Sequence, residues 1–402
     1  MNELLPRHDE ETSELLLGPR DREVRDAVRR VVRDVIASRA AEVDRDSLFP
    51  EVGYRALVEA GLAGLLVPET YGGSGDSLIA YVAAVEEIAR ACGSTSAVYM
   101  TQTHCATPIL LAGSEEQKRR CLPALCSGQV YGSLVVTEPD AGSDVARMRT
   151  TARREGDSYV LDGAKTFITT GDRARVMVLF ASVDLSAGRD GISAFLVEGD
   201  PDGLVRSRPM KKMGIRGSST AELAFQGCRV PASALLGEEG RGFELSMLSV
   251  VKSRMSAAAQ GVGYAGAAYA AAVEWAMARG LLAGGRPEAQ GLQFRLAGIR
   301  SRISAARVLL YATALAVERS DDGAIAAVSQ AKALCTDLGV EVAMEAVDLL
   351  GPDGDLQRFG IERALRDAKA GQIYDGTNEV QQIIVARDIR ARASGASLAR
   401  PH

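Results

Sequence analysis

The chain has 402 residues with a formal net charge of −5, and 25% of its residues are charged. This length is enough for two or three domains with sizeable cores. The acidic balance argues against nucleic acid or an anionic membrane as the main partner. No run approaches the roughly 18 consecutive apolar residues of a membrane-spanning helix, so we expect no membrane partner.

The six cysteines are scattered along the chain, and none has C-x-x-C spacing. This pattern favours reduced thiols over a zinc site or a disulfide framework. The acidic stretch 1–18 lacks the apolar core of a signal peptide. We therefore expect a cytoplasmic protein without a bound metal.

Residues 1–130 form the first predicted domain, and from about residue 20 the patterns are helical. Ser114 followed by Gln117 has the form of a capping box that opens a short helix. The stretch 78–92 carries apolar residues at helical spacing. These residues are Leu78, Val82, Val85, Ile88 and Ala89.

Residues 131–235 form the second predicted domain, in which the patterns change to short strands. Asp162-Gly163 is a strong signal for a hairpin turn. Further apolar runs occupy 176–180, 192–197 and 221–225. Several short strands separated by turns predict a small β-barrel or sandwich.

Residues 236–402 form the third predicted domain and return to helical patterns. Ala-rich stretches at 255–279 and 324–350 favour closely packed helices in a bundle. A last helix is predicted after Gly376-Thr377, with Val380, Ile383 and Ile384 on its buried face. This helix–strand–helix order allows a β domain and a bundle to hold a flat cofactor between them.

Seven blocks follow one another in the order known from one family, and any one alone is a weak motif. The blocks are Gly61-Leu-Ala-Gly-Leu-Leu-Val-Pro-Glu-Thr-Tyr-Gly-Gly73, Gly113-Ser-Glu-Glu-Gln-Lys118, Val136-Thr-Glu-Pro-Asp-Ala-Gly-Ser-Asp144, Gly163-Ala-Lys-Thr-Phe-Ile-Thr169, Met213-Gly-Ile-Arg-Gly217, Leu236-Gly-Glu-Glu-Gly-Arg-Gly-Phe243 and Ile373-Tyr-Asp-Gly-Thr-Asn-Glu-Val-Gln381. Together they make the chain resemble the acyl-CoA dehydrogenases over roughly residues 20–390. The resemblance implies an α+β protein with an N-terminal helical domain, a central small β-barrel and a C-terminal four-helix bundle.

The resemblance also implies FAD as cofactor. Val136 and Thr137 in the first flavin block, with Thr169 in the second, match positions that contact the flavin ring. Phe167 takes the aromatic position on one flavin face, and Ser143 lies in a turn that serves both the cofactor and the substrate arm. Taken singly, Thr and Phe at alternate strand positions are ordinary sheet residues.

The start of the last helix matches further binding positions. Thr377 and Glu379 correspond to cofactor-binding residues, because a helix N-terminus favours the FAD diphosphate. Thr377 is equally suited to be a plain N-cap. Gly376 and Arg254 correspond to positions that bind the substrate.

In the family the adenosine end of FAD reaches a neighbouring subunit, which implies a homodimer or homotetramer. The matching positions are Arg279, Gln290, Asp348 and Gly351. The match is imperfect, because the usual Arg-x-x-Phe-Gly reads Arg279-Gly-Leu-Leu-Ala283 and the usual Gln-x-x-Gly-Gly reads Asp348-Leu-Leu-Gly-Pro352.

Asp375 stands where the family usually keeps its catalytic glutamate. The alternative base position of the family aligns with Ser253, so Asp375 is the acid at either site. An aspartate is shorter by one methylene, and its oxygens fall about 1.5 Å short of those of a glutamate. In the other interpretation Asp375 only caps the final helix.

The resemblance implies α,β-dehydrogenation of an acyl thioester, with Asp375 taking the α-proton and flavin N5 the β-hydride. The substrate is bound to CoA or to an acyl carrier protein, since Val251 replaces the acid of the family's Asp-x-x-Arg motif before Arg254. The stretch Thr101-Gln-Thr-His104 maps to the acyl cavity and indicates a short or functionalised acyl group, although a lone histidine is more often a core residue. The electron acceptor is an electron-transfer flavoprotein or oxygen. Alternatives are a flavin oxidase or monooxygenase of secondary metabolism, and a non-catalytic binding protein.

Overall fold

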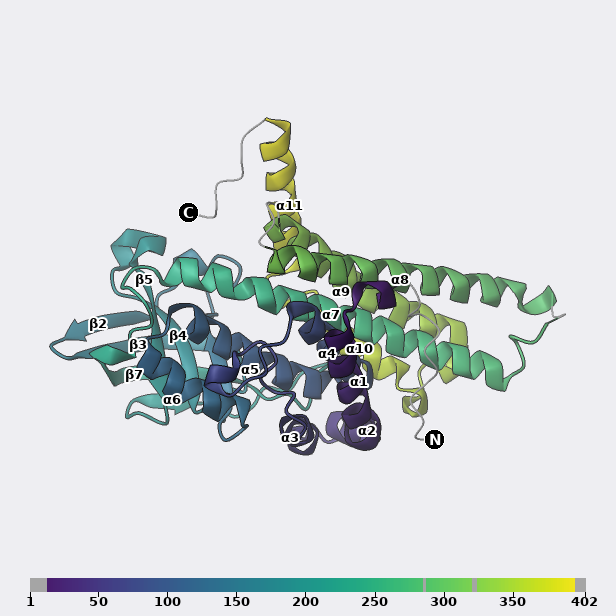
Figure 1. Ribbon diagram of the computed structural model, residues 1–402, viewed down its shortest axis with the longest axis horizontal. Coiled ribbons are helices and arrows are strands. Elements are labelled where there is room, and N and C mark those ends of the chain that lie inside the picture. Colours follow the sequence, from purple (N-terminus) through teal and green to yellow (C-terminus); the bar gives the residue numbers. More distant parts are fainter. Residues whose placement is uncertain (1–12, 285–286, 320–323, 395–402) are drawn as a thin grey trace.

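In the chain, one helical region precedes a β-sheet and another follows it (Figure 1). The computed structural model describes residues 13–284, 287–319 and 324–394. The sheet occupies one end of the molecule, and the long helices run from it to the other end (Figure 1). This arrangement confirms the predicted fold class. The terminal stretches 1–12 and 395–402 of the outer predicted domains lie outside the described residues.

The N-terminal region consists of helices that pack against one another and against the C-terminal helices. The N-terminal helices are α1 (Pro19–Val31), α2 (Ala37–Arg45), α3 (Glu51–Glu59), α4 (Leu78–Ala91), α5 (Gly93–Ala112) and α6 (Glu115–Cys126). The predicted apolar stripe of α4 is buried, and so are its other faces from Leu78 to Ala89. The helix is buried all round because it packs against α1, α5, α7 and α8. The predicted capping box at the start of α6 is confirmed, with Ser114 and Gln117 bonding each other's backbone N–H.

The central sheet is curled around its own apolar core. Its strands are β1 (Gly132–Val135), β2 (Thr151–Glu155), β3 (Ser158–Thr169), β4 (Val176–Ser182), β5 (Ile192–Glu198), β6 (Leu204–Arg206) and β7 (Thr220–Pro231). The strand order is β1-β4-β2-β3-β7-β6, with β5 paired to β4. One face encloses Leu161, Leu179 and Phe225, whereas the other packs on α5 and α6.

The expected hairpin turn at Asp162-Gly163 is wrong. The turn between β2 and β3 lies at Gly156-Asp157, and Gly163 is inside β3. Gly163 has a φ of +149°, and the pairing with β7 shifts register between Leu161 and Gly163. A Cβ at Gly163 would lie 2.5 Å from Thr150 Oγ1. The glycine therefore marks a bulge with close backbone approach, a second use of glycine that the sequence does not distinguish from a turn.

The C-terminal helices form a bundle that extends away from the sheet. They are α7 (Gly242–Ala278), α8 (Gln290–Glu318), α9 (Ala324–Leu350), α10 (Ile361–Gly371) and α11 (Asn378–Ala393). Small residues allow α7 and α9 to approach closely, since a Cβ at Gly339 would lie 2.9 Å from Gly261 O. A buried ion pair joins α4 to α8, with Arg307 Nε 2.8 Å from Glu86 Oε1.

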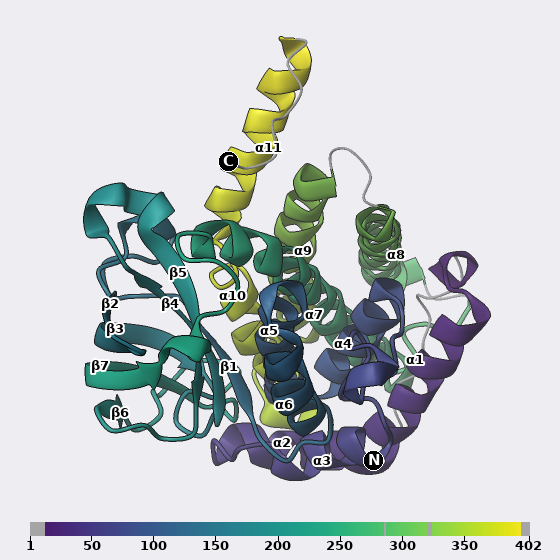
Figure 2. The same cartoon turned by 60° about the vertical axis from the view of Figure 1, so that its left-hand side comes forward.

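The predicted apolar face of α11 is only partly buried, because Ile383 is 50% exposed whereas Val380 and Ile384 are half-buried. The fully buried residues of α11 are Asn378, Gln381 and Asp388. Beyond its first turns α11 projects from the body of the molecule (Figures 1 and 2). The periodicity identified an apolar face, but it could not tell whether this chain covers that face.

Candidate active site

Asp375 lies in the short loop between α10 and α11. Asp375 and Gly376 have φ values of +55° and +84°, so two successive left-handed residues turn the chain sharply into α11. Aspartate is one of the few non-glycine residues that adopt this conformation at modest cost. Thr377 is the N-cap of α11, and its hydroxyl accepts from Val380 N at 3.4 Å. Thr377, and not Asp375, therefore caps the N-terminus of α11.

Side chains from α7, α9 and α11 hold this loop. Lys332 Nζ donates to Gly376 O at 2.9 Å and to Asn378 Oδ1 at 2.8 Å. Gln381 Nε2 also donates to Gly376 O at 2.9 Å. On the other side, Arg254 Nε lies 3.4 Å from Asp375 O. Three helices distant in sequence thus fix the backbone that carries the carboxylate.

The Asp375 carboxylate has a buried oxygen, Oδ2, without a hydrogen-bond partner among the described residues. Two cations lie nearby: burial lowers the pKa of Arg254, and burial lowers that of Lys332 to about 8, while the Asp375 charge opposes both shifts. Burial also lowers the pKa of His104, and Asp375 again opposes the shift. A partly exposed carboxylate with an unused oxygen is placed to accept a proton from a substrate.

Polar side chains of α5 and α7 lie close to this carboxylate. Ser256 Oγ donates to Ser253 O at 2.8 Å, so His104 Nε2–H is the donor in its 2.9 Å contact with Ser256 Oγ. Burial lowers the pKa of His104, which favours the neutral imidazole with Nδ1 as an acceptor. Gln102, from the same predicted stretch, has a structural role instead, since its Oε1 accepts from Gly132 N at 2.7 Å.

The two flavin blocks lie side by side at the edge of the sheet. Thr166 N donates to Thr137 O at 2.9 Å, and Lys165 Nζ donates to Val136 O at 2.9 Å. Between them Phe167 is 66% exposed and has a φ of +57°, at a register shift of β3 against β7. A large aromatic side chain held outward on a strained backbone fits a flat aromatic ligand. Thr169 ends the same strand.

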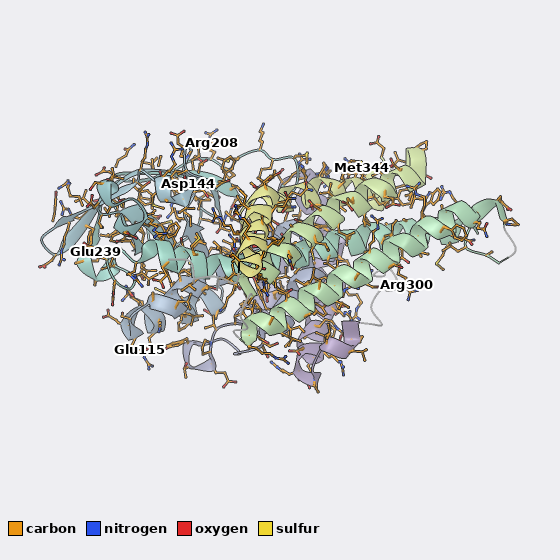
Figure 3. The ribbon with its side chains drawn as sticks, turned by 90° about the horizontal axis from the view of Figure 1, so that it is seen from above. Glu115, Asp144, Arg208, Glu239, Arg300 and Met344 are labelled. Carbon is orange, nitrogen blue, oxygen red and sulfur yellow. The ribbon has the colours of Figure 1, made fainter. Side chains whose placement is uncertain are left out.

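The other predicted cofactor positions near the loop are accessible. Ser143 is exposed in a turn after β1, next to Asp144, which Figure 3 shows on the sheet-bearing part of the molecule. A pocket at the N-terminal end of α11 is lined by residues that include Lys369, Thr377 and Glu379. Lys369 and the helix N-terminus favour an anionic ligand in this pocket, whereas the carboxylates of Asp337 and Glu379 oppose one.

The remaining predicted positions lie far from this loop. Arg279 follows α7, Gln290 begins α8, and Asp348 and Gly351 flank the end of α9, all at the end of the bundle opposite the sheet (Figure 1). Arg279 stacks on Trp275 at 4.4 Å and pairs with Asp353. The structure therefore does not bring these four residues together with Asp375 in one chain.

The sequence analysis missed the residues that support the site, above all Lys332, Asn378 and Glu138. Glu138 is buried and accepts from Arg149 N, Thr150 N and Lys165 Nζ. A signal for Lys332 did exist, since it is a lysine within the Ala-rich apolar stretch 324–350. Its partners lie more than 40 residues away, so the sequence could not name them.

Sequence models of three acyl-CoA dehydrogenase domains match the chain: the N-terminal domain at residues 18–129, the middle domain at 133–228 and the C-terminal domain at 240–390. The chain belongs to the acyl-CoA dehydrogenase family. Members of this family are FAD-dependent oxidoreductases that act on CH–CH groups of acyl-CoA thioesters.

Full-length relatives support this membership. The chain is 39% identical over 367 residues to an acyl-CoA dehydrogenase of Bacillus subtilis (strain 168), covering 90% of this chain and 96% of the relative. It superimposes on butyryl-CoA dehydrogenase from Megasphaera elsdenii with a TM-score of 0.89 at 34% identity, covering 93% and 99% of the two chains. The prolyl acyl carrier protein oxidase AnaB has a TM-score of 0.87 at 29% identity, with coverage of 93% and 99%.

Within the described ranges, none of the helices combines the length and the apolar character needed to cross a bilayer.

Proposed function

We propose that this acyl-CoA dehydrogenase family member oxidises an acyl thioester at its α,β carbon bond with Asp375 as the base. The Asp375 carboxylate takes the α-proton. FAD, when bound, supplies the acceptor for the β-hydrogen, which leaves with its electron pair. The thioester loses two hydrogens in all and gains a double bond, so protons and electrons balance.

The observation that carries this proposal is the unpartnered Oδ2 of Asp375 on a loop fixed by three helices. At the alternative base position of the family, Ser253 uses its hydroxyl to bond Val250 O at 3.0 Å. Because aspartate reaches about 1.5 Å less far than glutamate, we expect the thioester to lie correspondingly deeper.

The residues that would hold FAD are those of the two flavin blocks and of the α11 N-terminus. Val136, Thr137 and Thr169 would bond the polar edge of the ring, and Phe167 would pack on one face. Polar groups there stabilise negative charge on the reduced ring. Ser143, Thr377 and Glu379 are assigned to the diphosphate side, and Arg254, Gly376 and Ser143 to the substrate.

We assign Arg279, Gln290, Asp348 and Gly351 to the FAD of a second copy, since they lie far from the flavin blocks of their own chain. A homodimer or homotetramer would also cover the apolar face of α11, where Ile389 is 61% exposed. Light scattering of the FAD-loaded protein tests this assignment. A monomer with full FAD content would refute it.

Anaerobic mixing tests the function itself. A dehydrogenase should lose its flavin absorbance when mixed with a saturated acyl thioester in the absence of oxygen, and an enoyl product should form. Butyryl-CoA and longer acyl-CoAs are the first probes, with the corresponding enoyl-CoA as a control that cannot reduce the flavin. A FAD-loaded protein that no acyl thioester bleaches would refute the proposal.

A second candidate is oxidation of a polar acyl group carried by a protein. The observation that favours it is the buried His104–Ser256 pair near Asp375, which leaves an acceptor nitrogen for a substrate N–H or O–H. The similarity to a prolyl acyl carrier protein oxidase agrees with this polarity. A prolyl-loaded carrier protein should then bleach the flavin faster than butyryl-CoA, and His104→Leu should reduce this preference about tenfold or more.

The acceptor is tested in the same experiment. Reoxidation of the reduced protein by air within seconds, with release of hydrogen peroxide, would indicate oxygen, whereas slow reoxidation by air but fast reoxidation by an electron-transfer flavoprotein would indicate that protein. We place the enzyme in the cytoplasm, and its six free cysteines agree with a reducing compartment.

A further inference from the structure

Lys332 is a buried cation whose role the family comparison leaves open. Its side chain has no exposed surface, and its neighbours in α9 are mostly apolar. Burying an ammonium group is costly unless its charge is used or compensated. Its hydrogen bonds go to two uncharged oxygens, Gly376 O and Asn378 Oδ1. Hydrogen bonds alone do not require a cation here, because a neutral donor could make them.

The charge of Lys332 finds its counterpart in the adjacent loop. Burial lowers the pKa of Lys332 to about 8, and the carboxylate that opposes this shift most is Asp375. Asp337 and Glu379 act in the same direction, whereas Arg254 acts against it. The ammonium thus bonds the backbone of the loop that carries the base.

We propose that Lys332 is a positioning residue that holds the loop 374–378 and with it the base Asp375. Its bond to Gly376 O fixes the residue directly after the base, and its bond to Asn378 Oδ1 fixes the first residue of α11. This inference rests on the proposed role of Asp375 as the base.

Other titratable groups near Asp375 interact with its charge, and the substitutions of Lys332 leave them unchanged. Tyr81 on α4, His104 on α5, Arg254 on α7 and Tyr374 in the loop each sense the Asp375 charge. Among the cations, Arg254 bonds the carbonyl of Asp375 and Lys332 the carbonyl of Gly376. Arg254 from α7 and Lys332 from α9 therefore bond two successive carbonyl groups of the loop.

The test compares anaerobic flavin reduction in Lys332→Met, Lys332→Gln and Lys332→Arg. Without the two hydrogen bonds of the ammonium, we expect the maximal rate of flavin reduction to fall about 10- to 100-fold, with a smaller change in the half-saturating substrate concentration. Lys332→Gln keeps an uncharged donor on a shorter side chain and should lose part of the rate. Lys332→Arg keeps several donors and should retain the most.

Thr336→Val is the matched control. The Thr336 hydroxyl accepts from Asn378 Nδ2 at 3.0 Å, one turn along α9 from Lys332, and it is neutral. Its loss removes a bond to Asn378 but leaves the Lys332 bond to Gly376 O, so the rate should fall less than in Lys332→Met. Hydrogen exchange of the 374–378 amides should rise in both Lys332→Met and Thr336→Val, which measures loop order without relying on activity.

Two results would overturn the inference. One is a FAD-loaded Lys332→Met with the parent's rate and hydrogen exchange. The other, decisive if Lys332→Met does not fold, is a Lys332→Gln variant whose rate and hydrogen exchange match those of the parent. Failure of the proposed base is distinguishable, because Asp375→Asn would then keep its rate while the exchange data on Lys332 variants still report loop order.

Discussion

Asp375→Asn separates chemistry from structure more cleanly than any other substitution in this chain. The hydrogen bonds that residue 375 accepts go through its backbone carbonyl, from Arg254 Nε at 3.4 Å and Gln381 Nε2 at 3.5 Å. Asparagine also tolerates the left-handed φ of +55° found here. The substitution therefore removes no described hydrogen bond, but it removes the charge that faces the buried Arg254 and Lys332, and we expect the free energy of unfolding to fall by about 1 to 2 kcal/mol.

The rate should respond very differently. An amide cannot take the α-proton at neutral pH, and losing a positioned general base reduces the rate about 10²- to 10⁴-fold. This corresponds to about 3 to 5 kcal/mol in the activation free energy. A large change in rate beside a smaller change in stability is the expected signature of a base.

Asp375→Glu is the matched comparison. It restores the usual family reach of about 1.5 Å more, but a glutamate tolerates the left-handed backbone less well, at about 1 to 2 kcal/mol. We expect Asp375→Glu to retain more activity than Asp375→Asn and to be less stable than the parent protein. Stopped-flow anaerobic reduction, thermal unfolding and FAD content of both variants are the measurements. An asparagine variant that is fully loaded and within a few-fold of the parent rate would refute this reasoning.

Three further substitutions test other parts of the structure. Arg307→Met removes the ion-pair partner of the buried Glu86 carboxylate and should lower the free energy of unfolding by about 3 to 5 kcal/mol, more than the double substitution with Glu86→Leu, as measured by denaturant titration. Phe167→Ala should weaken FAD binding at least tenfold in a fluorescence titration yet leave the apoprotein's stability within about 0.5 kcal/mol, because the ring is 66% exposed. Burial raises the pKa of Asp367 to about 6; the folded state thus binds the proton more tightly than the unfolded state, and stability should fall by roughly 3 kcal/mol as pH rises from about 4 to 6. Asp367→Asn should lack this slope, because an amide does not titrate, and its Oδ1 can still accept from Ile215 N. An unchanged slope in pH-dependent thermal unfolding would contradict the assignment.

Local signals in the sequence were sufficient for the elements and the order of the three regions. The Ser114 capping box depends on residues within a few positions, and it occurs as predicted. The family blocks likewise identified the segment after β1 that carries Thr137 and the strand β3 that carries Phe167. These features are determined by short-range backbone preferences and by ordered motifs, which a single sequence displays directly.

The tertiary structure decided the features that depend on distant partners. Asp162-Gly163 has the composition of a turn, yet the approach of Thr150 makes Gly163 a bulge. The apolar face of α11 is visible in the sequence, but nothing local states that the chain leaves Ile383 exposed. In both cases the residue type limits the possibilities, and contacts from other elements select among them.

The surroundings of the candidate base show the same division. The sequence placed an aspartate at position 375 and a threonine suited to cap α11 at position 377. It could not show that Thr377 takes the cap, that an Asp375 oxygen has no described partner, or that Lys332 from α9 holds the next carbonyl. The sequence specifies each side chain, whereas the burial of that side chain and the charges around it depend on the packing of helices that lie far apart in the chain.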